Sequence, residues 1–266
     1  MNNTVLTEID RRGVATVILN RPDVNNAYNG DLILGLIDAF GALGADPRVR
    51  VVLIRGNGKH FQAGADLKWI MEMSKLSPEA NLQVSTDTTN AVRGLNEFPK
   101  PTIALVHGGC FGGGVGVVAA CDIVVASEDA FFAITEVRWG LIPVPIVPQL
   151  NARMGLANVR RYALTGERLD ARQAREIGLV NEVCATGKLD EAAAPIIDAL
   201  LMCGPNAIAQ TKANILELGN QVVGDDLAAR LARMHAAKRM TPESAEGLTS
   251  FLEKRKPAWY PGDAQS

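Results

Sequence analysis

The residues best suited to chemistry stand in a glycine-rich turn, Gly112–Gly114. A strand-like run, Thr102–His107, leads into this turn, and an apolar run ending near Cys121 follows it. Glycine adds no side chain to a core and loses much backbone entropy on folding, so these glycines indicate a tight turn or a close approach to backbone N–H groups. A helix that begins there has unpaired N–H groups and a partial positive charge at its first turn. The stretch can therefore hold an oxygen that carries or acquires negative charge.

Three interpretations of this turn compete: a tight turn into a core helix, a dinucleotide-binding fingerprint, and an oxyanion hole for acyl chemistry. Gly114-Val-Gly-Val-Val-Ala119 fits the G-x-G-x-x-A pattern of a dinucleotide site. A new strand-like run begins at Asp122, however, so the helix is far shorter than the ~10–12 residues that a crossover between parallel strands needs. This excludes the dinucleotide site. The oxyanion hole needs a second donor.

The second donor is expected in the loop Phe61-Gln-Ala-Gly-Ala-Asp66, which lies between a strand-like run and a helix start. Asp66 is suited to cap that helix. An ordinary loop would account for this segment by itself. Two such loops, each ahead of a short helix, predict a pair of backbone N–H groups aimed at one carbonyl oxygen.

Glu136 is the candidate for proton transfer. The alternative interpretation is that Glu136 is an ordinary surface acid between Phe132 and Trp139. Most of its neighbours are apolar: Ile134, Val137, Trp139, Leu141 and Ile142. A carboxylate in such surroundings is desolvated, which raises its pKa and suits proton transfer near neutral pH.

Composition describes a soluble globular enzyme or binding protein in the cytoplasm. The chain has 266 residues, 47% hydrophobic and 21% charged, and its net charge of −2 predicts no nucleic-acid partner. The four cysteines and three histidines show no metal-binding spacing, so we expect no metal and a reducing compartment. Neither a secretory signal nor an apolar run long enough for a membrane span is visible.

Hydrophobic periodicity predicts strands alternating with helices, and hence stacked α/β layers. The expected strands are Val5–Ile9, Val14–Asn20, Val49–Arg55, Thr102–His107, 122–126, 130–134 and Leu179–Val183. The expected helices are 30–45, one from Leu67, 77–96, a short one after Gly114, then 146–154, 157–164, 170–177 and a helical remainder from Leu189 with starts at Pro205 and Thr241. A strand–strand–helix unit recurs at least twice. We expect one α/β core over residues 1–200 and a helical region over 201–266.

The order and spacing of several short motifs resemble the crotonase (enoyl-CoA hydratase/isomerase) family from about residue 5 to residue 256. The motifs are Phe61-Gln-Ala-Gly-Ala-Asp-Leu-Lys68, Lys100-Pro-Thr-Ile-Ala, Gly112-Gly-Gly with Cys121-Asp-Ile, Glu136 ahead of Gly140-x-Ile-Pro143, Leu164-Thr-Gly, and Gly178-Leu-Val180. The resemblance implies a repeated ββα superhelix, with a C-terminal helical region used to form trimers or hexamers of two trimers.

The resemblance also implies the site. The N–H groups of Ala65 and Gly113 would hold the thioester oxygen of an acyl-CoA, and Glu136 would transfer the proton. CoA would be bracketed by two segments. One is the loop that holds Val24 and Asn26, and the other is Ala63–Leu67, with Ala63, Ala65, Asp66 and Leu67, close to Gly113. Lys254 and Lys256 of a neighbouring subunit are candidates for its phosphates, although a solvated basic end is the more common explanation of such lysines. No cofactor is expected beyond the CoA of the substrate.

One departure from the family pattern matters. The second carboxylate of the hydratases falls at Gly116, so the chain lacks it. The remaining pattern is most similar to a bacterial branch assigned to 3-methylglutaconyl-CoA and isohexenylglutaconyl-CoA hydration. We therefore expect a hydratase for a branched or glutaconyl-type 2-enoyl-CoA, whose own carboxylate could compensate, with Arg138 and Arg153 as candidate counter-charges. A Δ3-Δ2 enoyl-CoA isomerase using Glu136 alone and a non-catalytic acyl-CoA binder are the alternatives.

Overall fold

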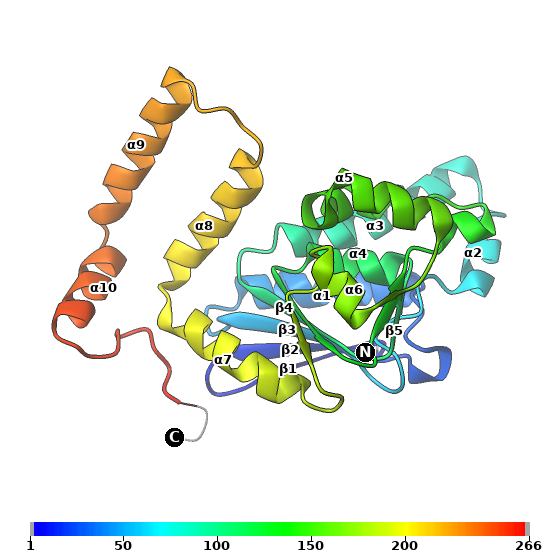
Figure 1. The fold of residues 1–266 in the computed structure, drawn as a ribbon, viewed down its shortest axis with the longest axis horizontal. Helices are drawn as coiled ribbons and strands as arrows, with labels where there is room; N and C mark the ends of the chain where they lie inside the picture. Colours follow the sequence, from blue (N-terminus) through cyan, green and yellow to red (C-terminus); the bar gives the residue numbers. More distant parts are fainter. Residues whose placement is uncertain (1–2, 264–266) are drawn as a thin grey trace.

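The computed structural model describes residues 3–263 and is built on a six-stranded sheet of order β1-β2-β3-β4-β6-β9 (Figure 1). Its strands are β1 (Val5–Ile9), β2 (Val14–Leu19), β3 (Val51–Gly56), β4 (Thr102–Val106), β6 (Ile123–Ser127) and β9 (Glu182–Cys184). The pair β1–β2 is antiparallel, and the other neighbouring pairs are parallel. The first six strand predictions hold to within about two residues. The last strand lies at 182–184 rather than at 179–183, because Leu179 and Val180 are buried outside the ladder.

Both faces of the sheet are buried along its central strands β2, β3, β4 and β6, as their nearly continuous apolar sequences require. Successive side chains of a strand point to opposite faces. Thus Val52 and Ile54 belong to one apolar cluster, whereas Val51 and Leu53 belong to the other. The second cluster is covered by α7 (Leu189–Met202).

The first cluster is covered by helices whose boundaries have local causes. They are α1 (Gly30–Ala45), α3 (Pro78–Asn96), α4 (Gly113–Ala120) and α5 (Val147–Thr165). Asn29 and Ser77 cap α1 and α3 by accepting from backbone N–H groups. The two helices expected over 146–164 are one helix with a kink at Gly155, where φ is 74°. Two shorter helices are α2 (Leu67–Met73), which has no buried residue, and α6 (Ala171–Glu176), which adds Ala171 and Ala174 to the first cluster.

A second, small sheet carries the functional loops. It consists of β5 (Gly109–Phe111), β7 (Phe131–Ala133) and β8 (Leu169–Asp170), in the order β5-β7-β8. The strand–strand–helix unit therefore repeats as β4-β5-α4 and β6-β7-α5. This repeat confirms the predicted α/β fold class. The strands β5 and β8 leave no signal in the sequence, because two or three residues show too little periodicity.

The C-terminal helices α8 (Pro205–Leu218), α9 (Asp225–Arg239) and α10 (Pro242–Leu252) extend away from the sheet (Figure 1). Lys212 of α8 anchors this region through an ion pair of 2.8 Å with Asp122. Among residues 3–263, no single helix is long and apolar enough to span a bilayer; α7 and α8 meet that test only together, with a bend of 104° between them. The predicted regions 1–200 and 201–266 include residues 1–2 and 264–266, which lie outside the described residues.

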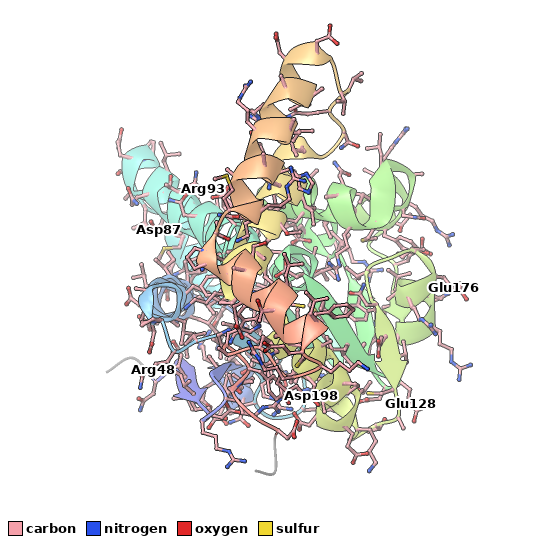
Figure 2. The ribbon with its side chains drawn as sticks, turned by 90° about the vertical axis from the view of Figure 1, so that its left-hand side faces the viewer. Arg48, Asp87, Arg93, Glu128, Glu176 and Asp198 are labelled. Atoms are coloured by element: carbon pink, nitrogen blue, oxygen red, sulfur yellow. The ribbon has the colours of Figure 1, made fainter. Side chains whose placement is uncertain are left out.

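Charged side chains lie at the periphery of the molecule. Figure 2 shows Arg48, Glu128 and Glu176 among them, and all three are exposed. Exposed ion pairs contribute ~0–1 kcal/mol each to stability. The two apolar layers are therefore the main source of stability.

Candidate active site

The two predicted donor loops lie side by side. Gln62 and Cys110 form a parallel bridge, in which the Phe111 N–H donates to the Gln62 carbonyl at 2.9 Å. Gly64 has a φ of +80°, and a Cβ on it would lie 3.1 Å from the Phe111 carbonyl oxygen. Only glycine accommodates this backbone conformation and this close approach together.

Backbone bonds on both sides of Ala65 leave its own N–H free. Tyr28 N–H donates to the Gly64 carbonyl at 2.8 Å, and Asp66 N–H donates to the Tyr28 carbonyl at 2.9 Å. In a parallel bridge, the residue between two such bonds directs its N–H away from the partner strand. Within the described part of the chain, Ala65 N–H has no acceptor.

The second donor, Gly113, is the first residue of α4, so its N–H has no partner within the helix. Gly112 precedes it with φ 49° and ψ −124°, a conformation that a side chain would strain. The structure thus brings both predicted donors to adjacent loops at one helix N-terminus.

A cavity of about 560 Å³ opens in front of these donors. Ala63, Ala65, Leu67, Gly113 and Glu136 all line it, together with apolar side chains of α2 and α3. This volume lies in the range of small-molecule sites. The fold therefore places five of the residues predicted for the site around one cavity.

Glu136 begins a short 3₁₀ helix, Glu136–Trp139, at the edge of the cavity. Its Oε2 is buried and has no hydrogen-bond partner. Burial raises the pKa of the carboxyl above its ordinary value of 4.5, and backbone N–H groups at Glu136 and Thr135 partly oppose the shift. It is the only acidic side chain among the described residues that line the cavity.

The expected source of that burial was partly wrong. Ile134 is buried, but Trp139 and Ile142 are 60% and 72% exposed. The carboxylate instead lies against the glycine turn, with its Oε1 only 3.1 Å from the position of a Cβ on Gly112. The contact that this places on Glu136 joins segments 24 residues apart in sequence and does not depend on the exposed part of the local apolar run.

The missing carboxylate at Gly116 has a structural counterpart. A Cβ on Gly116 would lie 2.0 Å from Cγ2 of Ile146, which is buried. Ile146 lines the cavity at this place. The space that a second carboxylate would need is therefore filled by an apolar side chain.

Two residues expected at CoA serve the scaffold. Asn26 is fully buried, and its side-chain amide donates to the carbonyl groups of Asn57, His60 and Phe61. It does not line the cavity, so its role is to hold the loop before the first donor. Asp66 caps α2 and pairs with Arg21 at 3.2 Å.

Val24 and Lys254 also lie outside the cavity lining. Val24 is 41% exposed on a 3₁₀ turn, Pro22–Val24. Lys254 is exposed just after α10, with a φ of 56°. The expectation for Lys254 concerns a neighbouring subunit, so its position within one chain does not test it.

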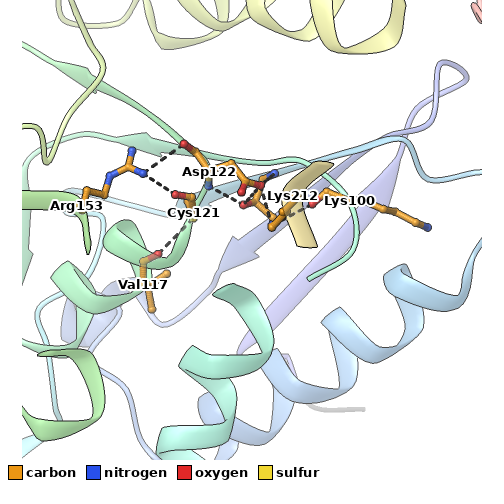
Figure 3. Close-up of polar contacts among 7 residues, drawn as sticks. Lys100, Val117, Cys121, Asp122, Arg153 and Lys212 are labelled. Carbon is orange, nitrogen blue, oxygen red and sulfur yellow. Dashed lines mark hydrogen bonds and ion pairs between the residues drawn. The ribbon is translucent and has the colours of Figure 1, made fainter. Parts of the chain in front are cut away.

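The expectation for Arg153 is wrong. Its guanidinium donates to the carbonyl oxygens of Cys121 at 2.8 Å and Asp122 at 3.2 Å (Figure 3). It also bonds Asn181 and the Leu179 carbonyl. Arg153 thus joins the end of α4 to α5 and does not line the cavity.

Arg138 does line the cavity, as does Arg168, which was not among the residues predicted for the site. The guanidinium of Arg168 lies 5.0 Å from the ring centroid of Phe131 and 5.9 Å from that of Phe111. Both arginines are exposed, and neither forms an ion pair with a described carboxylate. No local motif marked Arg168, because β8 brings it to the cavity from a distant segment.

The fold and site define a class: an α/β protein with two backbone donors and one buried acid at an apolar cavity. The enoyl-CoA hydratase/isomerase family model matches residues 10–262. The crystal structure of an enoyl-CoA hydratase from Shewanella pealeana is similar, with a TM-score of 0.93, 36% identity and 97% of both chains covered.

Curated relatives include both reaction types. A peroxisomal Δ(3,5)-Δ(2,4)-dienoyl-CoA isomerase of Arabidopsis thaliana is 31% identical, over 91% of this chain and 90% of its own length. A hydroxycinnamoyl-CoA hydratase-lyase of Pseudomonas fluorescens is 34% identical, over 79% and 76%. The chain belongs to the enoyl-CoA hydratase/isomerase family.

Proposed function

We propose that the protein hydrates a 2-enoyl-CoA thioester, with Glu136 as the acid–base group and Ala65 and Gly113 N–H as the oxyanion donors. The observation that carries this proposal is the position of the Glu136 carboxylate beside the Gly112–Gly113 turn. Gly113 and Ala65, the two residues with free N–H groups, line the same cavity as Glu136. Each donor contributes ~3–4 kcal/mol to the enolate-like transition state in comparable sites. No cofactor is required besides the CoA of the substrate.

The CoA moiety is assigned to the Ala63–Leu67 segment, beside the first donor. Ala63 and Leu67 line the cavity, and Asp66 holds the segment at the start of α2. Val24 would contribute an apolar contact from the neighbouring loop. Lys254 would approach the phosphates only from another subunit.

We further propose a substrate whose acyl chain ends in a carboxylate, as in a glutaconyl-type ester. Arg138 and Arg168 support this assignment, because they bring two positive charges to the cavity and pair with no described carboxylate. The guanidinium of Arg168 lies over the rings of Phe111 and Phe131, and this cation–π contact favours its position beside the cavity.

This assignment predicts a substrate preference. The kcat/KM for a glutaconyl-type CoA ester should exceed that for crotonyl-CoA by about tenfold or more, or ~1.4 kcal/mol. Loss of the conjugated enoyl-thioester absorbance measures both rates. Arg168→Gln should reduce the preference, whereas Arg172→Gln, an exposed change outside the cavity, should not. Equal kcat/KM values for the two esters would contradict the assignment. If Arg168→Gln lowered kcat/KM equally for the two esters, Arg168 would act on the CoA moiety or on the fold and not on the acyl carboxylate.

The second candidate function is a Δ3-Δ2 enoyl-CoA isomerase. The observation that favours it is Ile146, which fills the place of a second carboxylate, because proton transfer within the acyl chain requires only one acid–base group. Conversion of a 3-enoyl ester to its 2-enoyl isomer, with no water uptake by any 2-enoyl ester in the panel, would establish this alternative.

We also propose that the chain forms a homotrimer, or a hexamer of two trimers, through the helices after residue 205. Several large apolar side chains there are exposed in one chain: Ile215, Leu216, Val222, Met234, Leu248, Phe251 and Leu252. Packing these helices against the same helices of a neighbouring copy would remove this apolar surface from water.

Light scattering should therefore report the mass of three or six chains. Phe251→Glu, at a position 81% exposed in one chain, should weaken the assembly because it places a charge in the contact. A stable wild-type monomer at micromolar concentration would refute the proposal.

A further inference from the structure

Tyr28 links the two oxyanion donors. Its backbone makes both hydrogen bonds that flank Ala65, to Gly64 and from Asp66. Its ring reaches the other donor, since a Cβ on Gly113 would lie 2.6 Å from its Cε1 and 3.3 Å from its Cζ. One residue thus contacts both halves of the oxyanion hole.

The ring of Tyr28 is held in place, and its hydroxyl is available. Trp69 packs edge-on against the ring, with centroids 6.0 Å apart and an interplanar angle of 73°. Tyr28 lines the cavity, and its hydroxyl forms no hydrogen bond with another described residue. A polar group that faces a largely apolar cavity without a partner is placed to bind water or substrate.

Glu136 and Tyr28 both lie beside one peptide unit, the one that joins Gly112 and Gly113. Glu136 contacts the Cβ position of Gly112, and Tyr28 contacts that of Gly113. The N–H between these two glycines is the donor that would hold the thioester oxygen. Burial, with a smaller contribution from the charge of Glu136, raises the pKa of Tyr28 to about 12. The phenol therefore stays protonated during turnover.

We propose that the Tyr28 hydroxyl is a second catalytic group of the hydration: it accepts a hydrogen bond from the attacking water while Glu136 takes the other proton of that water. The inference rests on the proposed hydratase function. It assigns Tyr28 the water-holding task for which the chain has no second carboxylate, because Ile146 fills the space beside Gly116.

The step balances without a further reactant. Glu136 accepts a proton from water as the water oxygen bonds to C3, and the C2=C3 electron pair moves to give an enolate at the thioester oxygen. The Ala65 and Gly113 N–H groups hold that oxygen. Protonated Glu136 then returns a proton to C2, and the carbonyl re-forms. Tyr28 neither gains nor loses a proton.

The test is Tyr28→Phe, which keeps the ring against Gly113 and Trp69 and removes only the hydroxyl. With the enoyl ester that the wild-type protein hydrates fastest, kcat should fall about 10- to 100-fold, with KM within about threefold. The pH dependence of the remaining activity should keep the acidic limb that Glu136 produces. Tyr162→Phe, a buried phenol outside the cavity, is the matched control and should match the wild type.

Binding of acetoacetyl-CoA separates this role from a structural one. Its enolate occupies the oxyanion donors and needs no water, so its Kd should be within about threefold of wild type in Tyr28→Phe. A Tyr28→Phe protein with wild-type kcat would overturn the inference. A parallel loss of kcat and acetoacetyl-CoA binding would also overturn it, since Tyr28 would then act through the donors. Failure of the proposed function itself is distinct: the wild-type protein would hydrate no ester in the panel.

Discussion

Replacing Glu136 by glutamine should lower kcat by at least about 10²-fold, the usual loss when a general acid–base group is removed. Glutamine keeps the shape and polarity of the side chain but cannot carry the proton. The binding of CoA esters should change little, because Glu136 contacts the glycine turn and the acyl cavity rather than the Ala63–Leu67 segment. Steady-state rates and acetoacetyl-CoA titration check the two parts separately.

The raised pKa of Glu136 adds a pH dependence. As the base toward water it must be ionised, so kcat/KM should fall as the pH is lowered through its pKa, which lies above 4.5. The sign for stability is opposite. A carboxyl whose pKa is raised by folding binds its proton more tightly in the folded state, so its contribution to stability is greatest below 4.5 and is lost as the pH rises through the raised value. Glu136→Gln should therefore have a higher Tm than wild type near pH 8, and the difference should shrink toward pH 5.

The matched control is Glu176→Gln, an exposed carboxylate on α6 that does not line the cavity; Figure 2 labels this side chain. It should leave kcat unchanged. Turnover of Glu136→Gln within a few-fold of wild type would show that another group transfers the proton.

Replacing Gly113 by valine should abolish activity in a protein that still folds. The Cβ of residue 113 would lie 2.6 Å from Cε1 of Tyr28, so the ring or the helix N-terminus must move. Movement of the helix N-terminus displaces the donor N–H from the thioester oxygen, whereas movement of the ring takes Tyr28 away from the donor turn. Loss of one such donor costs ~10²–10³ in kcat, and displacement of Tyr28 adds to that loss.

Gly41→Val is the control for the general cost of valine at a helical glycine. Gly41 is exposed on α1, and a Cβ there meets no atom within 4 Å. Circular dichroism and cooperative thermal unfolding establish that both variants fold. A folded, active Gly113→Val would exclude the oxyanion hole at this turn.

The sequence by itself determined the features that have local causes. Helix caps such as Asp66 and Ser77, the apolar strand runs, and the glycines at 112–114 indicate structure from a few neighbouring residues. The order of short motifs identified the family, the two donor loops and Glu136. The same order located the missing carboxylate at Gly116.

Only the tertiary structure decided which side chains complete the site, because those contacts join segments far apart in sequence. The fold brings Tyr28 from the loop before α1 to Gly113, and Arg168, just before β8, to the rings of Phe111 and Phe131. Neither residue belongs to a motif, so composition and spacing could not reveal it. Arg153 is the opposite case. It is close to Glu136 in sequence, but in the fold its guanidinium donates to the carbonyl groups at the end of α4 and does not reach the cavity. Ile146 likewise fills the space beside Gly116 only because α4 and the segment before α5 pack together.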